Sequence, residues 1–236
     1  ADPTVGGGGL VVQRPDRSGV LVRGGTETPL PGRDPAIGAG RIAVVQGDEI
    51  AILSAKDLAE VGRVPAPGAD ALAVSGSWLA WRARVGDRDV IRARNLRDPA
   101  RPGPEHGLAR AGGASQLGRP SLDGNRLVYA RATRRENAIA LRVLGGKRGA
   151  RKATLLRSDD VGLSNPSIEG KYLAYVQHVR RSDRLRVGKL KRPRRARVVL
   201  SRAPRTLWST ALTKERAYVT VIGGTAPRQR VISVKR

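Results

Sequence analysis

The sequence of 236 residues contains no cysteine, no methionine and no phenylalanine, and only two histidines, His106 and His178. The absence of cysteine excludes a disulfide framework and any thiolate metal site. Two histidines are too few for a histidine-rich metal centre, and both are interpreted as exposed loop residues. The sequence therefore predicts no metal and no cofactor. No apolar run approaches the roughly 18 residues that a membrane-spanning helix requires.

Two of these absences also bear on the core and on the start of the chain. Without phenylalanine, the core must be built from Leu, Val, Ile and Ala, with three Trp and four Tyr. Abundant Val with few aromatic residues favours many thin, closely stacked strands. Because the chain starts at Ala1 and has no methionine, we expect that a signal peptide was removed or that the sequence was cut at this point. A removed signal peptide would place the protein outside the cytoplasm, either in an extracytoplasmic compartment or secreted.

One stretch of sequence occurs twice in nearly the same form, at 119–143 and at 165–187. Each copy predicts a short strand, a turn that contains Gly, a second strand, a polar loop and a third strand. A single unit of this kind buries one face of its sheet, so it must stack on others like it.

The same apolar positions recur along the whole chain. The position of Leu122 is repeated at Val5, Ile37, Val74, Ile168 and Leu212, and the position of Leu127, five residues later, at Leu10, Ile42, Leu79, Leu173 and Ala217. Third strands are predicted over 20–22, 50–53, 90–93, 139–143, 185–187 and 231–234. Weaker fourth strands follow at 28–30, 61–64, 154–156 and 198–200, with a poor candidate near Leu108 and none after the last unit.

Four strands in each unit, repeated six times, predict an all-β fold, a six-bladed β-propeller whose last blade is three-stranded. We expect a single domain over 1–236, with blades at about 1–32, 33–69, 70–117, 118–163, 164–207 and 208–236. Ala55–Glu60 could form one helical turn at most. Gln229–Arg236 should be an exposed edge, which is either protected by the charges of Arg228, Arg230, Lys235 and Arg236 or paired with a strand from another chain.

The repeated motif is Pro-x-φ-x-Gly-x-x-φ-φ-Tyr followed by Ile-x-φ-x-φ, where φ is an apolar residue. Pro120–Tyr129 with Ile139–Val143, and Pro166–Tyr175 with Leu185–Val187, fit it best. This motif resembles the repeat of TolB-like β-propellers, which are common in bacterial extracytoplasmic proteins. The turns at Asp123 and Glu169 are shorter than the family's common Ser-Pro-Asp-Gly turn. The resemblance implies a propeller that binds proteins or glycans, and it implies no catalytic residues.

The aromatic residues of the repeat have a structural interpretation. Trp81, Tyr129 and Tyr175 occupy a core position of the second strand, where packing is expected. Trp78 and Tyr172 lie three residues earlier, on the other strand face, and should pack between neighbouring sheets. Trp208 leads into the last unit and is assigned either to the core or to the lining of a central channel.

Motifs of catalysis are mostly missing. Gly38–Ala43 spells a dinucleotide fingerprint but runs into a strand, whereas the fingerprint must open a helix. No Gly-x-Ser-x-Gly elbow occurs, so the sequence predicts no enzyme of that kind. A carbohydrate-active enzyme with a site in the central channel stays an alternative, which would need two converging carboxylates. The acidic pairs in predicted loops are Asp48 with Glu49, Asp87 with Asp89, and Asp159 with Asp160.

The net charge of +25 is confined to one half of the chain. Residues 1–118 contain 15 basic and 13 acidic side chains, and residues 119–236 contain 30 basic and 7 acidic ones. The halves thus carry +2 (15 − 13) and +23 (30 − 7). Such an asymmetry predicts a face with a strong positive field, or else a solvated surface rich in Arg.

The basic loops of the fourth and fifth units are the candidate site, because Arg binds phosphate, sulfate and carboxylate in a bidentate manner. In a propeller, loops between second and third strands open on one face, and loops between third and fourth strands open on the other. The loops lack interleaved aromatic residues, which disfavours stacking on single-stranded nucleic acid. The predicted polyanion-binding residues are Arg134, Arg135, Lys147, Arg148, Arg151, Lys152, Arg180, Arg181, Lys189, Lys191, Arg192, Arg194 and Arg195.

The sequence therefore predicts a non-enzymatic, extracytoplasmic binding or assembly module. Its partner would be a protein or an anionic glycan of the cell envelope. The first alternative is a sequence-nonspecific binder of polyanions or nucleic acid that uses the basic half, and the second is the carbohydrate-active enzyme.

Overall fold

The apolar residues that mark the repeat are cross-strand partners. Val5 lies opposite Leu10, Leu122 opposite Leu127 and Ile168 opposite Leu173, and the other three marker pairs are paired in the same way. The predicted first and second strands and their register are therefore confirmed. The computed structural model describes residues 4–6, 9–14, 16–145, 151–203, 206–223 and 228–236.

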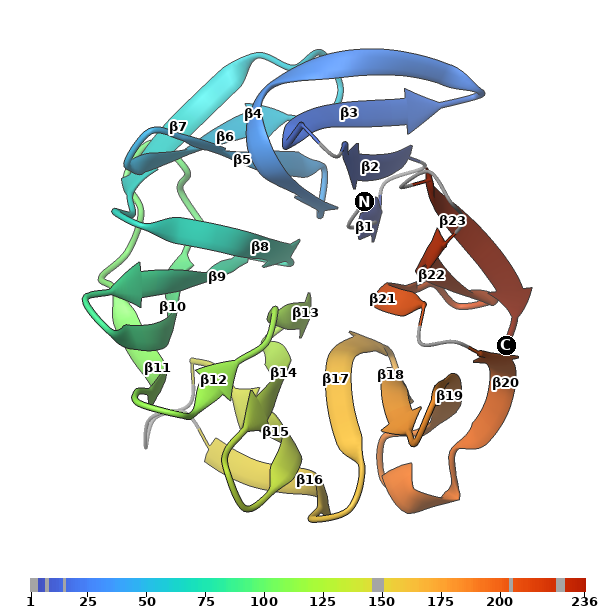
Figure 1. The fold of residues 1–236 in the computed structure, drawn as a ribbon. Helices are drawn as coiled ribbons and strands as arrows, with labels where there is room; N and C mark the ends of the chain where they lie inside the picture. Colours follow the sequence, from blue (N-terminus) through green and yellow to red (C-terminus); the bar gives the residue numbers. More distant parts are fainter. Residues whose placement is uncertain (1–3, 7–8, 15, 146–150, 204–205, 224–227) are drawn as a thin grey trace.

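The described residues form five antiparallel sheets around a central axis (Figure 1). The first sheet contains β1 (Thr4–Gly6), β2 (Gly9–Gln13), β3 (Ser18–Arg23), β4 (Thr26–Gly38), β5 (Arg41–Gln46), β6 (Glu49–Ser54) and β7 (Glu60–Pro65). The second contains β8 (Ala69–Ser75), β9 (Trp78–Val85), β10 (Arg88–Asn95) and β11 (His106–Ala111).

The remaining three sheets come from the basic half of the chain, except for the two residues of β12. The third contains β12 (Gln116–Leu117), β13 (Ser121–Asp123), β14 (Arg126–Ala132), β15 (Asn137–Val143) and β16 (Arg151–Ser158). The fourth contains β17 (Gly162–Glu169), β18 (Tyr172–Val179), β19 (Ser182–Lys189) and β20 (Arg197–Arg202). The fifth contains β21 (Leu207–Leu212), β22 (Arg216–Gly223) and β23 (Arg228–Lys235).

The first sheet has seven strands because β4 serves two hairpins. Its first part pairs with β3 and its second part pairs with β5, and the pairing to β5 shifts between Arg33 and Ala36. Asp34 lies at this shift with a φ of 51°. The two units that the sequence separates near residue 33 are therefore joined by one continuous strand, and the described residues form five sheets rather than six.

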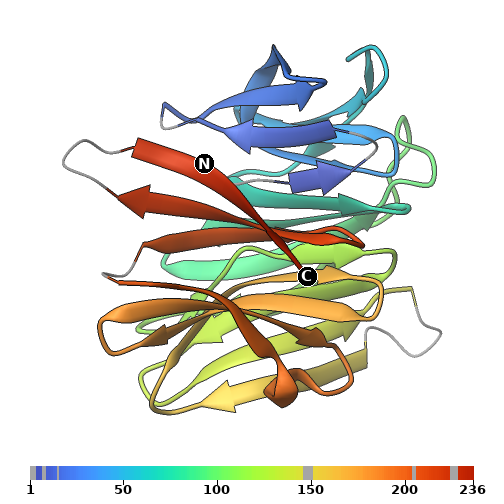
Figure 2. The same ribbon diagram turned by 90° about the vertical axis from the view of Figure 1, so that its right-hand side faces the viewer.

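Each sheet turns its innermost strand toward the axis, and the sheets stack face to face around it (Figures 1 and 2). Buried apolar clusters fill the spaces between neighbouring sheets. Trp81, Tyr129 and Tyr175 are core residues as predicted, and Trp78 packs between the second and third sheets. The chain closes the ring where β1 contacts β21. This arrangement is that of a β-propeller.

The structure corrects one local prediction, that on Trp208, and confirms two others. Trp208 is 57% exposed, so it belongs neither to the core nor to the channel lining. Ala55–Glu60 contains turns and no helix, and the one helix among the described residues is the 3₁₀ turn η1 (Pro193–Arg195). No described helix is long and apolar enough to cross a membrane. The poor candidate near Leu108 is the strand β11, the fourth strand of its sheet, which pairs with β10 through a register shift between Ile91 and Arg92.

Candidate functional site

The predicted basic loops lie at opposite ends of the strands. Arg180 and Arg181 connect β18 to β19, and Lys189 ends β19. Because β19 has eight residues, its two ends are roughly 23 Å apart. Arg134 and Arg135 join β14 to β15, which is the same place in the third sheet as Arg180 and Arg181 in the fourth. We call these two ends the Arg180 rim and the Lys189 rim.

The structure brings together three of the thirteen predicted residues. Lys189, Arg192 and Arg195 line one cavity on the Lys189 rim, whereas Arg194 lines a separate cavity beside Tyr175. Lys152, Lys191, Arg134, Arg135, Arg180 and Arg181 are exposed, and Arg151 begins β16. Lys147 and Arg148 lie outside the described residues.

We call the first cavity the basic cleft. It measures about 400 Å³, and it is lined by Tyr172, Val187, Gly188, Lys189, Arg192, Arg195, Arg197 and Arg236. Arg197 begins β20, and Arg236 follows β23 of the next sheet. Sequence reasoning did not assign these two cations, or Tyr172, to the site. Arg197 was visible in the basic run after Arg180, but Arg236 reaches the cleft only because the fifth sheet packs on the fourth.

Two buried residues attach the β19–β20 loop to the core, so its charged residues are exposed to solvent. Leu190 and Ala196 are buried in the core between the third and fourth sheets. The backbone N–H of Leu190 donates to the Lys171 carbonyl at 2.8 Å, and Arg186 Nη1 donates to the Ala196 carbonyl at 2.7 Å. A side chain at Gly188 would lie 2.6 Å from Ala196 Cα, so glycine lets the loop fold back on β19. The charged residues between the anchors therefore remain in solvent.

Arg236 forms the opposite wall of the cleft. Its guanidinium lies over the Tyr172 ring, 3.7 Å from the centroid, and its Nη1 donates to the Thr213 carbonyl at 3.0 Å. The cation–π contact and the hydrogen bond fix this side chain across the boundary between two sheets. Tyr172 packs on the core with its other face, as the sequence predicted.

The cleft is a site of unbalanced positive charge. No Asp or Glu side chain is among the described residues that line it. Within the described part of the chain, Lys189, Arg192, Arg195 and Arg197 form no ion pair. An anion about 4 Å from one such cation gains about 4 kcal/mol of Coulomb energy near a protein surface before desolvation is counted. The cleft can therefore hold a phosphate, sulfate or carboxylate group by charge-assisted hydrogen bonds.

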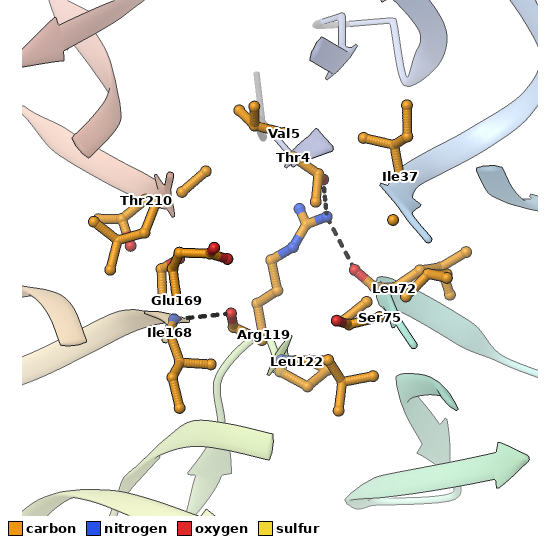
Figure 3. Close-up of a pocket in the computed structure, with 18 of the residues that line it drawn as sticks. Thr4, Val5, Ile37, Leu72, Ser75, Arg119, Leu122, Ile168, Glu169 and Thr210 are labelled. Atoms are coloured by element: carbon orange, nitrogen blue, oxygen red, sulfur yellow. Dashed lines mark hydrogen bonds between the residues drawn. The ribbon is translucent and has the colours of Figure 1, made fainter. Parts of the chain in front are cut away.

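The central channel is a second cavity, of about 190 Å³ (Figure 3). Arg119 extends across it from the gap between β12 and β13. Its Nη2 donates to the Leu72 carbonyl at 3.2 Å and to the Pro35 carbonyl at 3.4 Å, and it lies 3.5 Å from Thr4 Oγ1. Arg119 thus links inner strands on the far side of the axis. The Arg119 side chain therefore occupies part of the channel (Figure 3).

The channel also bears on the alternative of a carbohydrate-active enzyme. Glu169 is the one carboxylate among the described residues that line it, and none of them is a histidine. Burial and the nearby charge of Asp123 raise the pKa of the Glu169 carboxyl, while Lys214 and Arg236 oppose the rise. Glycoside hydrolysis by the common mechanism needs two carboxylates on either side of the bond. The described part of the channel therefore offers no such pair.

His178 is not a simple exposed loop residue, which corrects the sequence prediction. It lies in β18, where Nδ1 is 2.7 Å from Asp183 Oδ1 and Nε2 is 2.7 Å from Ser164 Oγ. Asp183 is 1% exposed, and its other oxygen accepts the backbone N–H of Leu207 at 2.9 Å. The spacing resembles that of a Ser-His-Asp triad. Ser164 Oγ also accepts a hydrogen bond from Asn165 Nδ2 at 3.2 Å.

The same contact occurs in the second sheet without a histidine. Asp89 is buried in β10, although the sequence placed it in a loop, and it accepts the backbone N–H of Leu117 at 3.1 Å. Each aspartate thus accepts a backbone N–H from the start of the next sheet. Because the contact occurs twice, we interpret Asp183 and Asp89 as residues that connect neighbouring sheets. Among the described residues, no three His, Asp or Glu side chains converge on a point that could hold a metal.

Comparisons with known proteins agree with a propeller fold. No family model matches the chain, and no curated protein matches it. A solved structure of Kuenenia stuttgartiensis hydrazine synthase is similar, with a TM-score of 0.62 and 14% identity over 98% of this chain and 82% of that chain. The β-propeller domain of the trilobed protease of Pyrococcus furiosus, described as having an open velcro topology, has a TM-score of 0.52 and 9% identity over 99% of this chain and 92% of that one.

Peptidases are also among the similar structures. A puromycin-hydrolyzing peptidase of Mycobacterium tuberculosis has a TM-score of 0.59 and 13% identity, and the match covers 99% of this chain and 43% of that chain. This chain therefore spans less than half the length of that peptidase. At these identities the comparisons show the fold alone: the chain is a β-propeller.

Proposed function

We propose that this chain is a binding module for an anionic polymer, such as a sulfated or phosphorylated glycan, and that it works outside the cytoplasm. The observation that carries the proposal is the basic cleft, where five cations from two sheets face one cavity with no Asp or Glu side chain among its described lining residues. The extracytoplasmic setting is supported by the resemblance of the repeat to TolB-like propellers. We propose membership of that family on the same grounds.

The proposal includes six blades. The first and second parts of β4 pair with different neighbours, and their pairing shifts at Asp34. Similar register shifts occur in β8, β17 and β21, which are innermost strands of their sheets. The shift in β4 therefore supports reading the seven-stranded sheet as two blades that share one long strand. The module would then have a single domain with the blade boundaries that the sequence predicts.

A polymer is favoured over a small anion because exposed cations extend beyond the cleft. Lys191 lies in the same loop, and Arg180 and Arg181 occupy the other rim, roughly 23 Å away by the length of β19. One phosphate or sulfate group cannot reach both rims, whereas a chain of such groups can. Binding of this kind tracks charge and not sequence.

Single-stranded nucleic acid is the second candidate ligand. Trp208 is 57% exposed, and an exposed aromatic ring is a surface on which a base can stack. The candidate differs from the glycan in a measurable way, because base stacking adds affinity that a sugar polymer of equal charge does not provide.

The test is the salt dependence of binding to heparin, measured by titration calorimetry between 50 and 200 mM NaCl. We expect the logarithm of the affinity to fall linearly with the logarithm of salt, by roughly two orders of magnitude over this range for four or five released counterions. A single-stranded oligonucleotide of matched charge is the comparison. Tighter binding of the oligonucleotide would favour the second candidate, and no heparin binding at 50 mM NaCl would refute the proposal.

A further inference from the structure

The outer edge of β23 is unpaired in the described part of the chain. All eight residues of β23 pair with β22, and β23 ends the fifth sheet. The N-terminal strands do not complete this sheet, because β1 and β2 pair with each other and β2 pairs with β3. An edge of this length presents free backbone N–H and C=O groups, which readily accept another strand.

Leu200, an apolar residue next to this edge, is less buried than the corresponding residue of the preceding sheet, Leu156. Leu156 of β16 is 7% exposed, because it packs with Leu190 and Ala196 of the connection that follows the third strand of the next sheet. Leu200 of β20 holds the same register position, since it pairs with Leu185 as Leu156 pairs with Ile139. Leu200 is only half-buried.

Among the described residues, no connection covers Leu200 in the way that Leu190 and Ala196 cover Leu156. Val199, Leu200, Ile232 and Val234 are all half-buried and pack against the same core cluster, and β20 contacts β23. A strand added to the edge of β23 would bury these side chains. At about 25 cal/mol for each Å² of apolar surface removed from water, such cover is a substantial driving force.

We propose that the edge of β23 docks an extended, acidic segment of a partner protein by strand addition. Side chains alternate along a strand, so Arg230 and Arg236 lie on the face of Ile232 and Val234, and Lys235 lies on the opposite face. Arg202 ends the neighbouring strand β20. Apolar residues of an added strand would cover Leu200 on the face of Ile232 and Val234, and glutamate or aspartate at the alternate positions would lie beside Lys235 on the opposite face. A second copy of this chain fits less well, because antiparallel pairing of two β23 strands would bring like charges together.

The experiment uses the whole chain and an eight-residue peptide that alternates Val and Glu. Amide hydrogen exchange is measured by NMR with and without the peptide. We expect the outward-facing amides of β23 to exchange fast in the free protein and at least tenfold more slowly at saturation. A peptide with alternate backbone amides N-methylated should not protect them, because it cannot complete the ladder.

Two variants connect the effect to this surface. Leu200→Glu should weaken peptide binding at least tenfold, since it removes the apolar surface that the peptide would cover and adds a negative charge that repels the peptide. Val61→Glu is the matched control, because Val61 is an exposed residue of β7, the last strand of the first sheet, and should change nothing. Absence of β23 protection, equal binding of the N-methylated peptide, or amides already protected in a dimer of the free protein would each overturn the proposal.

Discussion

Reversal of the five cations of the β19–β20 loop to Glu should reduce the affinity for heparin by roughly two orders of magnitude at near-physiological salt. The variant replaces Lys189, Lys191, Arg192, Arg194 and Arg195. The loss of affinity has two causes, because the cleft loses three of its five cations and the new carboxylates repel the ligand. Retention on a heparin column, with affinity confirmed by calorimetry, measures the effect. The fold should be kept because these side chains are exposed.

The matched control has the same net charge. Each variant lowers the formal charge from +25 to +15, since five substitutions change it by ten (25 − 10). The control set is taken from the first half of the chain, where no described ion pair would be broken. Its members are Arg41, Lys56, Arg97, Arg101 and Arg110. An equal loss in both variants would mean that heparin responds to net charge alone, and the cleft would not be a site.

Asp183→Ala should lower the free energy of unfolding by about 3 kcal/mol, which is the largest single-residue effect that we expect. The substitution leaves the buried N–H of Leu207 without its acceptor and removes the partner of His178. For a chain of this size, the melting temperature should fall by roughly 6–12 °C. Thermal unfolding followed by circular dichroism measures the change.

Asp160→Ala is the control for this prediction, because Asp160 is exposed and lies in no described ion pair. It should shift the melting temperature by less than about 1 °C. Asp89→Ala removes the same type of contact from the second sheet and should destabilise in the same direction. A melting temperature of Asp183→Ala within error of the wild-type value would show that the contact does not hold the sheets together.

The strands and their register could be predicted from the sequence because they depend on local pattern. Leu122 and Leu127 flank a turn with Gly124 at a φ of 58°, and the same spacing recurs in every unit. The continuity of β4 was not predicted, because the repeat divides the chain into two units near residue 33 and a proline such as Pro31 or Pro35 has no N–H to donate to a ladder. Both are accommodated, and the strand bends at the register shift after Arg33.

The candidate site was predicted only in part, because a cleft is a product of tertiary structure. The basic stretch after Arg180 predicted Lys189, Arg192 and Arg195 as site residues, but nothing in the sequence places Arg236 over Tyr172. His178 was misjudged for the same reason. Its partners are the nearby Asp183 and Ser164, and only strand pairing reveals that they meet.

The most direct test of the central claim is to observe the arginine side chains themselves. NMR of the guanidinium Nε–H groups, during titration with a heparin-derived tetrasaccharide at 150 mM NaCl, resolves individual contacts. The account predicts saturable shifts with one shared dissociation constant at Arg192, Arg195, Arg197 and Arg236. Small, non-saturating shifts spread evenly over arginines of both halves of the chain would contradict it.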